Sequence, residues 1–272
     1  MSSVVSSLIR ESPTDHPSGY THAGWAEAFP WLAQGITRGG SGEDACDLGI
    51  FSGASPAAPV LARWERLRRA TGALRVVHAK QPHGATVRFH RSGPPGLLLA
   101  EPCDGHATAD PGVLLAVSVA DCVPVTVVDP EHRAVAVLHA GWRGVAAGVL
   151  ERGVQVLEER CAARTHALHV HLGPSICGRC YEVSPEVFAA LGLPEPAGPA
   201  PLDLRAVLAE RACAAGVARK RVTVSEHCVR CGEGSFFSHR AGDEERQVAY
   251  AMVRMPGARN HPERRGIPVT HA

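Results

Sequence analysis

The stretch VLLAVSVADCVPVTVVDPEHRAVAVLHAGWRG, residues 113–144, carries the clearest information about the fold. It contains three runs dominated by Val, Leu and Ala, at 113–119, 124–128 and 134–138. Such near-continuous apolar runs predict strands that are covered on both faces. The tetrapeptide Asp-Pro-Glu-His at 129–132 has Asp and Pro where a tight turn favours them. We therefore expect the last two runs to form a buried hairpin.

Helix signals follow this stretch. After Gly144, apolar residues recur at steps of three, four and seven as far as Leu157, which predicts an amphipathic helix that Gly148 and Gly153 weaken. Two further helices are expected, one opened by Ser184-Pro185 and ending at Leu191, the other opened by Asp203 and ending near Ala215. Further strands are expected at 166–172, 222–224 and 247–253. These elements predict an α/β (α+β) protein with a mixed β-sheet core.

The chain shows no linker and no internal repeat between its ends. We therefore expect a single domain over residues 25–254. Residues 1–24 are rich in Ser, Pro and His and are expected to be a loose tail, and residues 255–272 an irregular one.

Bulk composition excludes several classes of protein. The 272 residues are 45% apolar and 20% charged, with a formal net charge of +1, so no basic field exists for nucleic acid. The sequence contains no apolar run long enough for a membrane span and no secretory signal. Nine cysteines without an export signal are expected to be reduced. We expect a cytoplasmic protein that binds neither nucleic acid nor membranes.

Polar residues stand out where the apolar strands end, at 81–84, 120–124 and 139–144. Among them, His83, Cys122 and His139 are two imidazoles and a thiol, a set that suits zinc and leaves a fourth position open. Taken singly, a buried thiol and hydrogen-bonded histidines are the commoner roles. Arg143 precedes the expected helix, where free N–H groups favour an anion.

Seven segments in order resemble the YfiH-type family, also called laccase-domain proteins, over about residues 25–254. They are Gly35-Ile36-Thr37-Arg38-Gly39-Gly40, Gln81-Pro82-His83-Gly84, Asp104-Gly105-His106-Ala107-Thr108, Ala120-Asp121-Cys122-Val123-Pro124, His139-Ala140-Gly141-Trp142-Arg143-Gly144, Gly173-Pro174 leading to Cys180-Tyr181-Glu182-Val183, and Phe236-Phe237-Ser238-His239-Arg240. The second, fourth and fifth segments hold the three candidate ligands. The resemblance implies a layered α-β-β-α fold and zinc bound by His83, Cys122 and His139.

The activity that the resemblance implies is phosphorolysis of purine nucleosides (adenosine, inosine or guanosine), with methylthioadenosine cleavage and adenosine deamination also attributed to the family. The substrates would then be a purine nucleoside and phosphate. Arginines are the expected anion ligands, and the candidates are Arg38, Arg143 and Arg240. Besides Cys122, the candidate catalytic residues, able to transfer a proton, are His106, Asp121 and His239.

The sequence departs from the family pattern at four peripheral places. They are Asp47 where an Asn is expected, Val229 after Cys228, Ala241 after Arg240, and Glu245 before Arg246. The ligands are intact, so the class of activity is a safer expectation than the identity of the substrate.

Two other activities stay open. The set of two His and one Cys could hold copper in a polyphenol oxidase, but His169-Val170-His171 is the only paired-histidine element, and we expect it on an exposed strand face. Alternatively, Cys122 and His139 could be the nucleophile and base of a hydrolase that edits peptidoglycan peptides. Zinc bound to Cys122 would exclude that role.

Two Cys-x-x-Cys pairs, Cys177/Cys180 and Cys228/Cys231, have the local spacing of a structural zinc site. The gap between the pairs is far longer than in a zinc ribbon, which argues against such a site.

Overall fold

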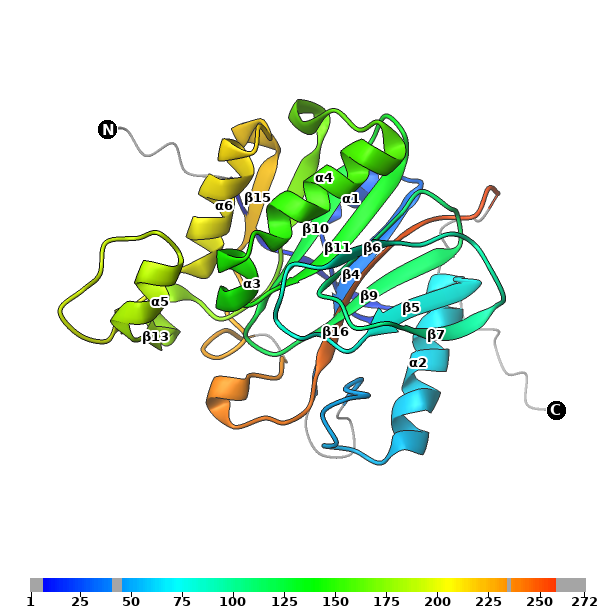
Figure 1. Cartoon of the computed structure of the whole chain (residues 1–272). Coiled ribbons are helices and arrows are strands. Elements are labelled where there is room, and N and C mark those ends of the chain that lie inside the picture. The colour runs from blue at the N-terminus through cyan, green and yellow to red at the C-terminus, as the bar shows by residue number, and fades with distance from the viewer. Residues whose placement is uncertain (1–6, 41–45, 234–235, 258–272) are drawn as a thin grey trace.

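The computed structural model describes residues 7–40, 46–233 and 236–257. Two seven-stranded sheets lie face to face, and helices cover their outer faces (Figure 1). This arrangement confirms the expected single layered α-β-β-α fold.

The first sheet is built around the expected hairpin, in which β10 and β11 pair antiparallel so that Pro124 lies opposite His139. Its strand order is β1-β15-β12-β10-β11-β8-β6. The bounds are β1 Ser7–Ile9, β15 Val222–Ser225, β12 His169–Leu172, β10 Val123–Asp129, β11 Ala134–Ala140, β8 Gly105–Thr108 and β6 Val87–Phe89.

The second sheet has the strand order β2-β3-β4-β16-β9-β5-β7. Its strands are β2 Ser12–Asp15, β3 Ser18–Thr21, β4 Leu32–Thr37, β16 Gln247–Val253, β9 Val113–Val119, β5 Arg75–Ala79 and β7 Gly96–Ala100. Two more short strands, β13 Glu182–Val183 and β14 Ala200–Pro201, pair outside the large sheets.

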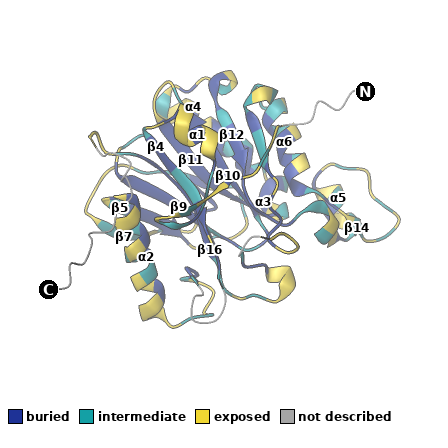
Figure 2. Cartoon of the chain, turned by 180° about the vertical axis from the view of Figure 1, so that it is seen from behind, coloured by how far each residue is buried: buried dark blue, intermediate teal, exposed yellow. Residues whose placement is uncertain are grey.

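Apolar side chains fill three layers. Between the sheets, Val135 and Val137 of β11 pack in one cluster with Leu115 and Val117 of β9. The outer face of the first sheet is covered by α4, Val149–Cys161, and α6, Leu204–Ala214. The outer face of the second sheet is covered by α2, Ala57–Thr71, through residues such as Trp64. In Figure 2 the strands are largely buried while the helices expose their outer sides.

The helices expected after Gly144, at Ser184-Pro185 and at Asp203 begin and end close to the predicted residues, whereas α2 was not predicted. The single helix expected after Gly144 is divided into two helices, α3 (Trp142–Ala146) and α4. Gly148, which lies between them, adopts a φ of 84° and interrupts the helix. α5, Pro185–Ala190, has Pro at its start, and the Asp203 side chain accepts the N–H groups of Arg205 and Ala206 to cap α6. α1 spans Ala23–Ala28. None of the helices in the described ranges is long and apolar enough to cross a bilayer.

The prediction of a loose tail over residues 1–24 is wrong for residues 7–24. β1 adds to β15 in parallel, and the β2–β3 hairpin adds to β4. β1 and β2 are only three and four residues long and mostly exposed, so they carry no apolar periodicity that the sequence could reveal. Residues 1–6 and 258–272 lie outside the described residues, so the rest of the two expected tails is not described.

The prediction that His169 and His171 lie on an exposed strand face is also wrong. His171 is buried and its Nε2 contacts Glu11 Oε1 at 2.8 Å, while the Trp25 ring of α1 packs against both histidines. The face is covered because the N-terminal segment folds over it.

Candidate metal centre and cavity

The three candidate metal ligands converge at one end of the β10–β11 hairpin. Cys122 directly precedes β10, His139 lies in β11, and His83 lies in the loop between β5 and β6. One donor atom from each lies within 4.8 Å of the other two. The His83 and His139 rings stand nearly perpendicular, with centroids 4.7 Å apart.

Unusual backbone conformations bring these side chains together. His83 has a φ of 63° and Asp121, next to Cys122, a φ of 82°. Positive φ is uncommon for residues other than glycine and is found at sites where the surrounding structure enforces it. Opposite them, a Cβ on Gly141 would lie 3.0 Å from Cys122 Sγ and 3.0 Å from His83 Cδ2. Glycine at 141 therefore leaves room for the thiol and the imidazole.

Asp104, which is fully buried, orients two of the ligands. Its Oδ1 accepts the His139 Nδ1–H at 2.9 Å and the backbone N–H of His83 at 2.9 Å, and its Oδ2 accepts the N–H of Gly84. A carboxylate on Nδ1 fixes the ring so that Nε2 is the free donor, an arrangement common behind metal-bound histidines.

The electrostatics of the site favour a thiolate at Cys122. Burial opposes ionisation, but the charge and hydrogen bonds of His139 and His83 outweigh it and lower the pKa of Cys122 to about 6. Burial likewise disfavours the charged form of His139, but the Cys122 thiolate and Asp104 raise its pKa to about 9. The thiolate is also the form of cysteine that binds a divalent cation.

The donor set fits a metal ion of borderline softness. Two imidazoles and a thiolate are ligands shared by zinc and copper, and three protein ligands leave a coordination position for water or substrate. The three residues border a cavity of about 570 Å³, so that position is accessible to a small molecule.

Several predicted site residues line this cavity. Arg143, Asp121, His239 and Arg240 all border it. Arg143 is an exposed residue within α3, not before it as expected, and its guanidinium lies over the Trp142 ring.

Asp121 and Arg240 belong to one hydrogen-bonded corner. The Asp121 carboxylate accepts the Ser238 hydroxyl at 2.6 Å and the Arg240 N–H at 2.7 Å. The Arg240 guanidinium lies over the Tyr181 ring and donates to the Glu182 carbonyl at 3.1 Å. Both carboxylate oxygens of Asp121 are therefore engaged in holding the 238–240 segment in place.

Two predicted site residues lie elsewhere. His106 is fully buried, does not line the cavity, and its Nδ1 contacts His90 Nε2 at 2.9 Å. Its side chain therefore cannot reach a substrate held in this cavity, because β8 directs it into the protein. Arg38 is exposed at the end of β4 and is not among the cavity residues.

Sequence reasoning missed functional residues that the fold brings to the cavity. Asp104 begins one of the segments that resemble the family, but no signal in the sequence marks it as the partner of His139. Arg246 also lines the cavity, and Asp47, one of the departures from the family pattern, accepts its N–H at 2.9 Å. Tyr181, Lys80 and Phe51 also line the cavity.

Known proteins resemble this chain in sequence and in structure. The structure of YlmD from Geobacillus stearothermophilus superposes with a TM-score of 0.81 at 30% identity, over 91% of this chain and all of YlmD. A Mycobacterium tuberculosis protein named purine nucleoside phosphorylase is 36% identical over 206 residues, 72% of this chain and 80% of that protein.

A third relative, named adenosine deaminase RL5 and from an unknown prokaryotic organism, is 39% identical over 153 residues. That alignment covers 52% of this chain and 57% of RL5, so the chain matches little more than half of the length of this relative.

The family model described as multi-copper polyphenol oxidoreductase laccase matches residues 33–254. This range contains both halves of the β10–β11 hairpin and all three candidate ligands. The chain therefore belongs to the multi-copper polyphenol oxidoreductase laccase family, which includes the YfiH-type proteins that its motifs resemble.

Proposed function

We propose that this chain is a cytoplasmic, zinc-dependent purine nucleoside phosphorylase. The observation that carries the proposal is the position of His83, Cys122 and His139, whose donor atoms lie within 4.8 Å of one another at the edge of a cavity of about 570 Å³. That cavity is of the size that small-molecule sites have and is bordered by arginines.

The reaction transfers the ribosyl group from a base to phosphate. A phosphate oxygen forms a bond to ribose C1′, the C1′–N9 bond breaks, its electron pair goes to the purine, and the purine takes up a proton. The products are ribose 1-phosphate and the free base. When bound, zinc would supply positive charge that polarises an oxygen of ribose, phosphate or water.

The residues of the chain would bind and orient the reactants. Arg143 and Arg240 border the cavity and would bind phosphate by charge-assisted hydrogen bonds. His239, which is exposed to the same cavity, is the candidate to donate a proton to purine N7. Asp121, with both oxygens already accepting hydrogen bonds, would position the segment that carries His239 and Arg240.

The names of the relatives support this choice of activity. Proteins named purine nucleoside phosphorylase occur among the relatives in Geobacillus, Deinococcus, Streptomyces and Mycobacterium. One named adenosine deaminase supports deamination of adenosine as a second activity of the same site.

Product analysis tests the proposal. Purified protein of known zinc content is incubated with adenosine or inosine, with and without phosphate. We expect free base and ribose 1-phosphate only when phosphate is present. Inosine formed from adenosine would show the second, deaminase activity; inosine without any phosphorolysis would identify a deaminase instead, and absence of both reactions in zinc-loaded protein would overturn the proposal. Cys122→Ala is expected to abolish turnover and zinc binding by His83 and His139, because two protein ligands make a weak site.

The runner-up is a cysteine hydrolase, and one observation favours it. In the arrangement without metal, Cys122, His139 and Asp104 form a chain in which burial opposes ionisation of the thiol but its histidine neighbours bring its pKa to about 6. The order nucleophile, base, carboxylate is that of a catalytic triad. Treatment with iodoacetamide distinguishes the hydrolase from the phosphorylase. Alkylation of Cys122 in zinc-loaded protein, with no loss of zinc, favours the hydrolase. Protection of Cys122 by zinc favours the phosphorylase.

A further inference from the structure

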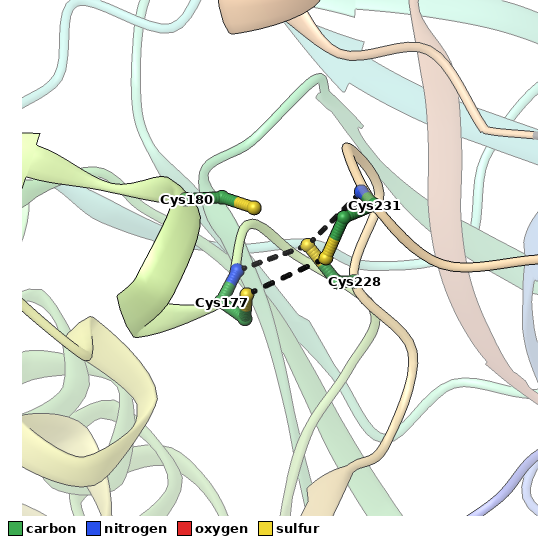
Figure 3. A group of neighbouring side chains, drawn as sticks. All are labelled: Cys177, Cys180, Cys228 and Cys231. Atoms are coloured by element: carbon green, nitrogen blue, oxygen red, sulfur yellow. Dashed lines mark hydrogen bonds between the residues drawn. The ribbon is translucent and has the colours of Figure 1, made fainter.

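We propose a second metal site, a closed tetrathiolate zinc centre formed by Cys177, Cys180, Cys228 and Cys231. The four sulfur atoms all lie within 4.8 Å of one another (Figure 3). This centre uses none of the residues of the cavity's candidate metal site, so it stands whether or not the proposed phosphorylase activity is correct.

The fold explains how two Cys-x-x-Cys pairs that are far apart in the sequence can share one metal ion. A gap of nearly fifty residues separates the two Cys-x-x-Cys pairs, but β12 and β15 are neighbouring parallel strands, with Leu172 opposite Val224. The carboxyl ends of parallel neighbours meet at the same sheet edge. The first pair follows β12 and the second follows β15, so both pairs arrive at that edge.

The distances suit a shared metal ion. Cys177 Sγ and Cys231 Sγ are 3.8 Å apart. With zinc–sulfur bonds of about 2.3 Å, two corners of a tetrahedron are separated by about 3.8 Å. A disulfide would require about 2.05 Å, so the observed separation is that of two ligands and not of a bonded pair.

Backbone donors surround the sulfur atom that is most buried. The N–H groups of Cys177 and Cys231 point at Cys228 Sγ, at 3.3 and 3.5 Å. Donors from both pairs on one sulfur stabilise a thiolate, the form that binds metal.

The loop after β15 is wound tightly around this sulfur. The Gly232 N–H donates to the Cys228 carbonyl, and a Cβ at 232 would lie 2.4 Å from that oxygen. Ser175 and Cys228 form a parallel bridge that joins this loop to the one after β12. The two loops are thus already in register at the point where the metal would join them.

The second ion would connect two loops that border the cavity. The loop after β12 carries Ile176 and Tyr181, and the loop after β15 leads to His239 and Arg240, all of which line the cavity. Four protein ligands leave no open coordination position, as in structural and not catalytic zinc sites. The second ion would fix the two loops to each other and so position the residues that would bind the substrate.

Metal analysis tests the proposal on the full-length protein. Elemental analysis is carried out on zinc-loaded wild type, Cys122→Ala, Cys231→Ser and Cys213→Ser. We expect about two zinc ions per chain in the wild type, and about one in Cys122→Ala and in Cys231→Ser. Cys213→Ser, which replaces a half-buried cysteine of α6 outside both sites, is the matched control and should keep both ions.

X-ray absorption of Cys122→Ala, which would retain only the second ion, should show four sulfur neighbours at about 2.3 Å. Folded Cys122→Ala without zinc would overturn the proposal. So would a first shell containing nitrogen or oxygen, or a Cys177–Cys231 disulfide found by mass spectrometry of freshly purified protein. If Cys231→Ser does not fold, the thiols of the wild type are labelled with iodoacetamide instead. The four cysteines should resist labelling until a chelator is added. Labelling to the same extent with and without chelator would contradict the site.

Discussion

His139 donates its Nδ1–H to Asp104 at a distance of 2.9 Å, and both side chains are buried. The same carboxylate oxygen also accepts the backbone N–H of His83. One buried anion thus sets the ring of one candidate ligand and the main chain of another. The proposed metal centre depends on this contact even though Asp104 is not itself a proposed ligand.

Replacing Asp104 by Asn should weaken zinc binding by about 10–100-fold, because the amide lacks the negative charge that makes His139 a strong metal ligand. The amide also places an N–H₂ group next to the N–H groups that the carboxylate accepts. The zinc affinity is measured by competition with a chromophoric chelator, and folding by circular dichroism. The control is Asp110→Asn, an ion-paired aspartate beyond the site. Wild-type zinc affinity in folded Asp104→Asn would show that the carboxylate does not support the metal.

Gly141→Ala should reduce zinc binding and turnover together, because the added methyl group would lie 3.0 Å from both Cys122 Sγ and His83 Cδ2. The matched control is Gly198→Ala, where nothing lies within 4 Å of the added Cβ. Zinc content and the rate of nucleoside cleavage are compared in the two variants. Unchanged zinc content in Gly141→Ala would mean that the ligands meet elsewhere.

Arg143→Met should raise the KM for phosphate by roughly 10–100-fold, the effect of losing one charge-assisted hydrogen bond of about 1.5–3 kcal/mol. Its effect on the KM for the nucleoside should be smaller. Arg69→Met on α2, a surface residue whose side chain is 74% exposed, serves as the control. An equal change in both KM values would assign Arg143 a general structural role and not phosphate binding.

Glu11→Gln should destabilise the protein by about 1–3 kcal/mol at neutral pH, because a buried ionic hydrogen bond is lost. Burial opposes ionisation of Glu11, but hydrogen bonds from His171 and Ser225 lower its pKa below the ordinary 4.5. A lowered folded-state pKa contributes stability above pH 4.5 that is lost as the pH falls through the folded value.

The measurement is the free energy of unfolding by urea at several pH values for wild type, Glu11→Gln and the exposed control Glu27→Gln. The difference between wild type and Glu11→Gln should be largest above pH 4.5 and shrink below it. His227, whose Nε2 lies 3.8 Å from Glu11 Oε2, faces the same carboxylate. A difference that grows toward acid pH would contradict the prediction.

Local sequence pattern was sufficient for the elements around the candidate site. The apolar runs of 113–144 and their turn predicted β9, β10 and β11, because a strand buried on both faces must be apolar at nearly every position. The caps at Ser184 and Asp203 predicted α5 and α6 for a similarly local reason. Motif resemblance predicted the family and grouped His83, Cys122 and His139.

By itself, then, the sequence determined the family, the set of candidate ligands, and the strands and helices between Val113 and Val253 that carry an apolar run or a cap, because those depend on near neighbours in the chain or on short motifs. Only the tertiary structure decided that Asp104 lies behind His139, that His106 lies away from the cavity, that residues 7–21 extend both sheets and that four distant cysteines meet. Each of these depends on strand order and register, which bring together residues far apart in sequence and leave no periodic pattern along the chain.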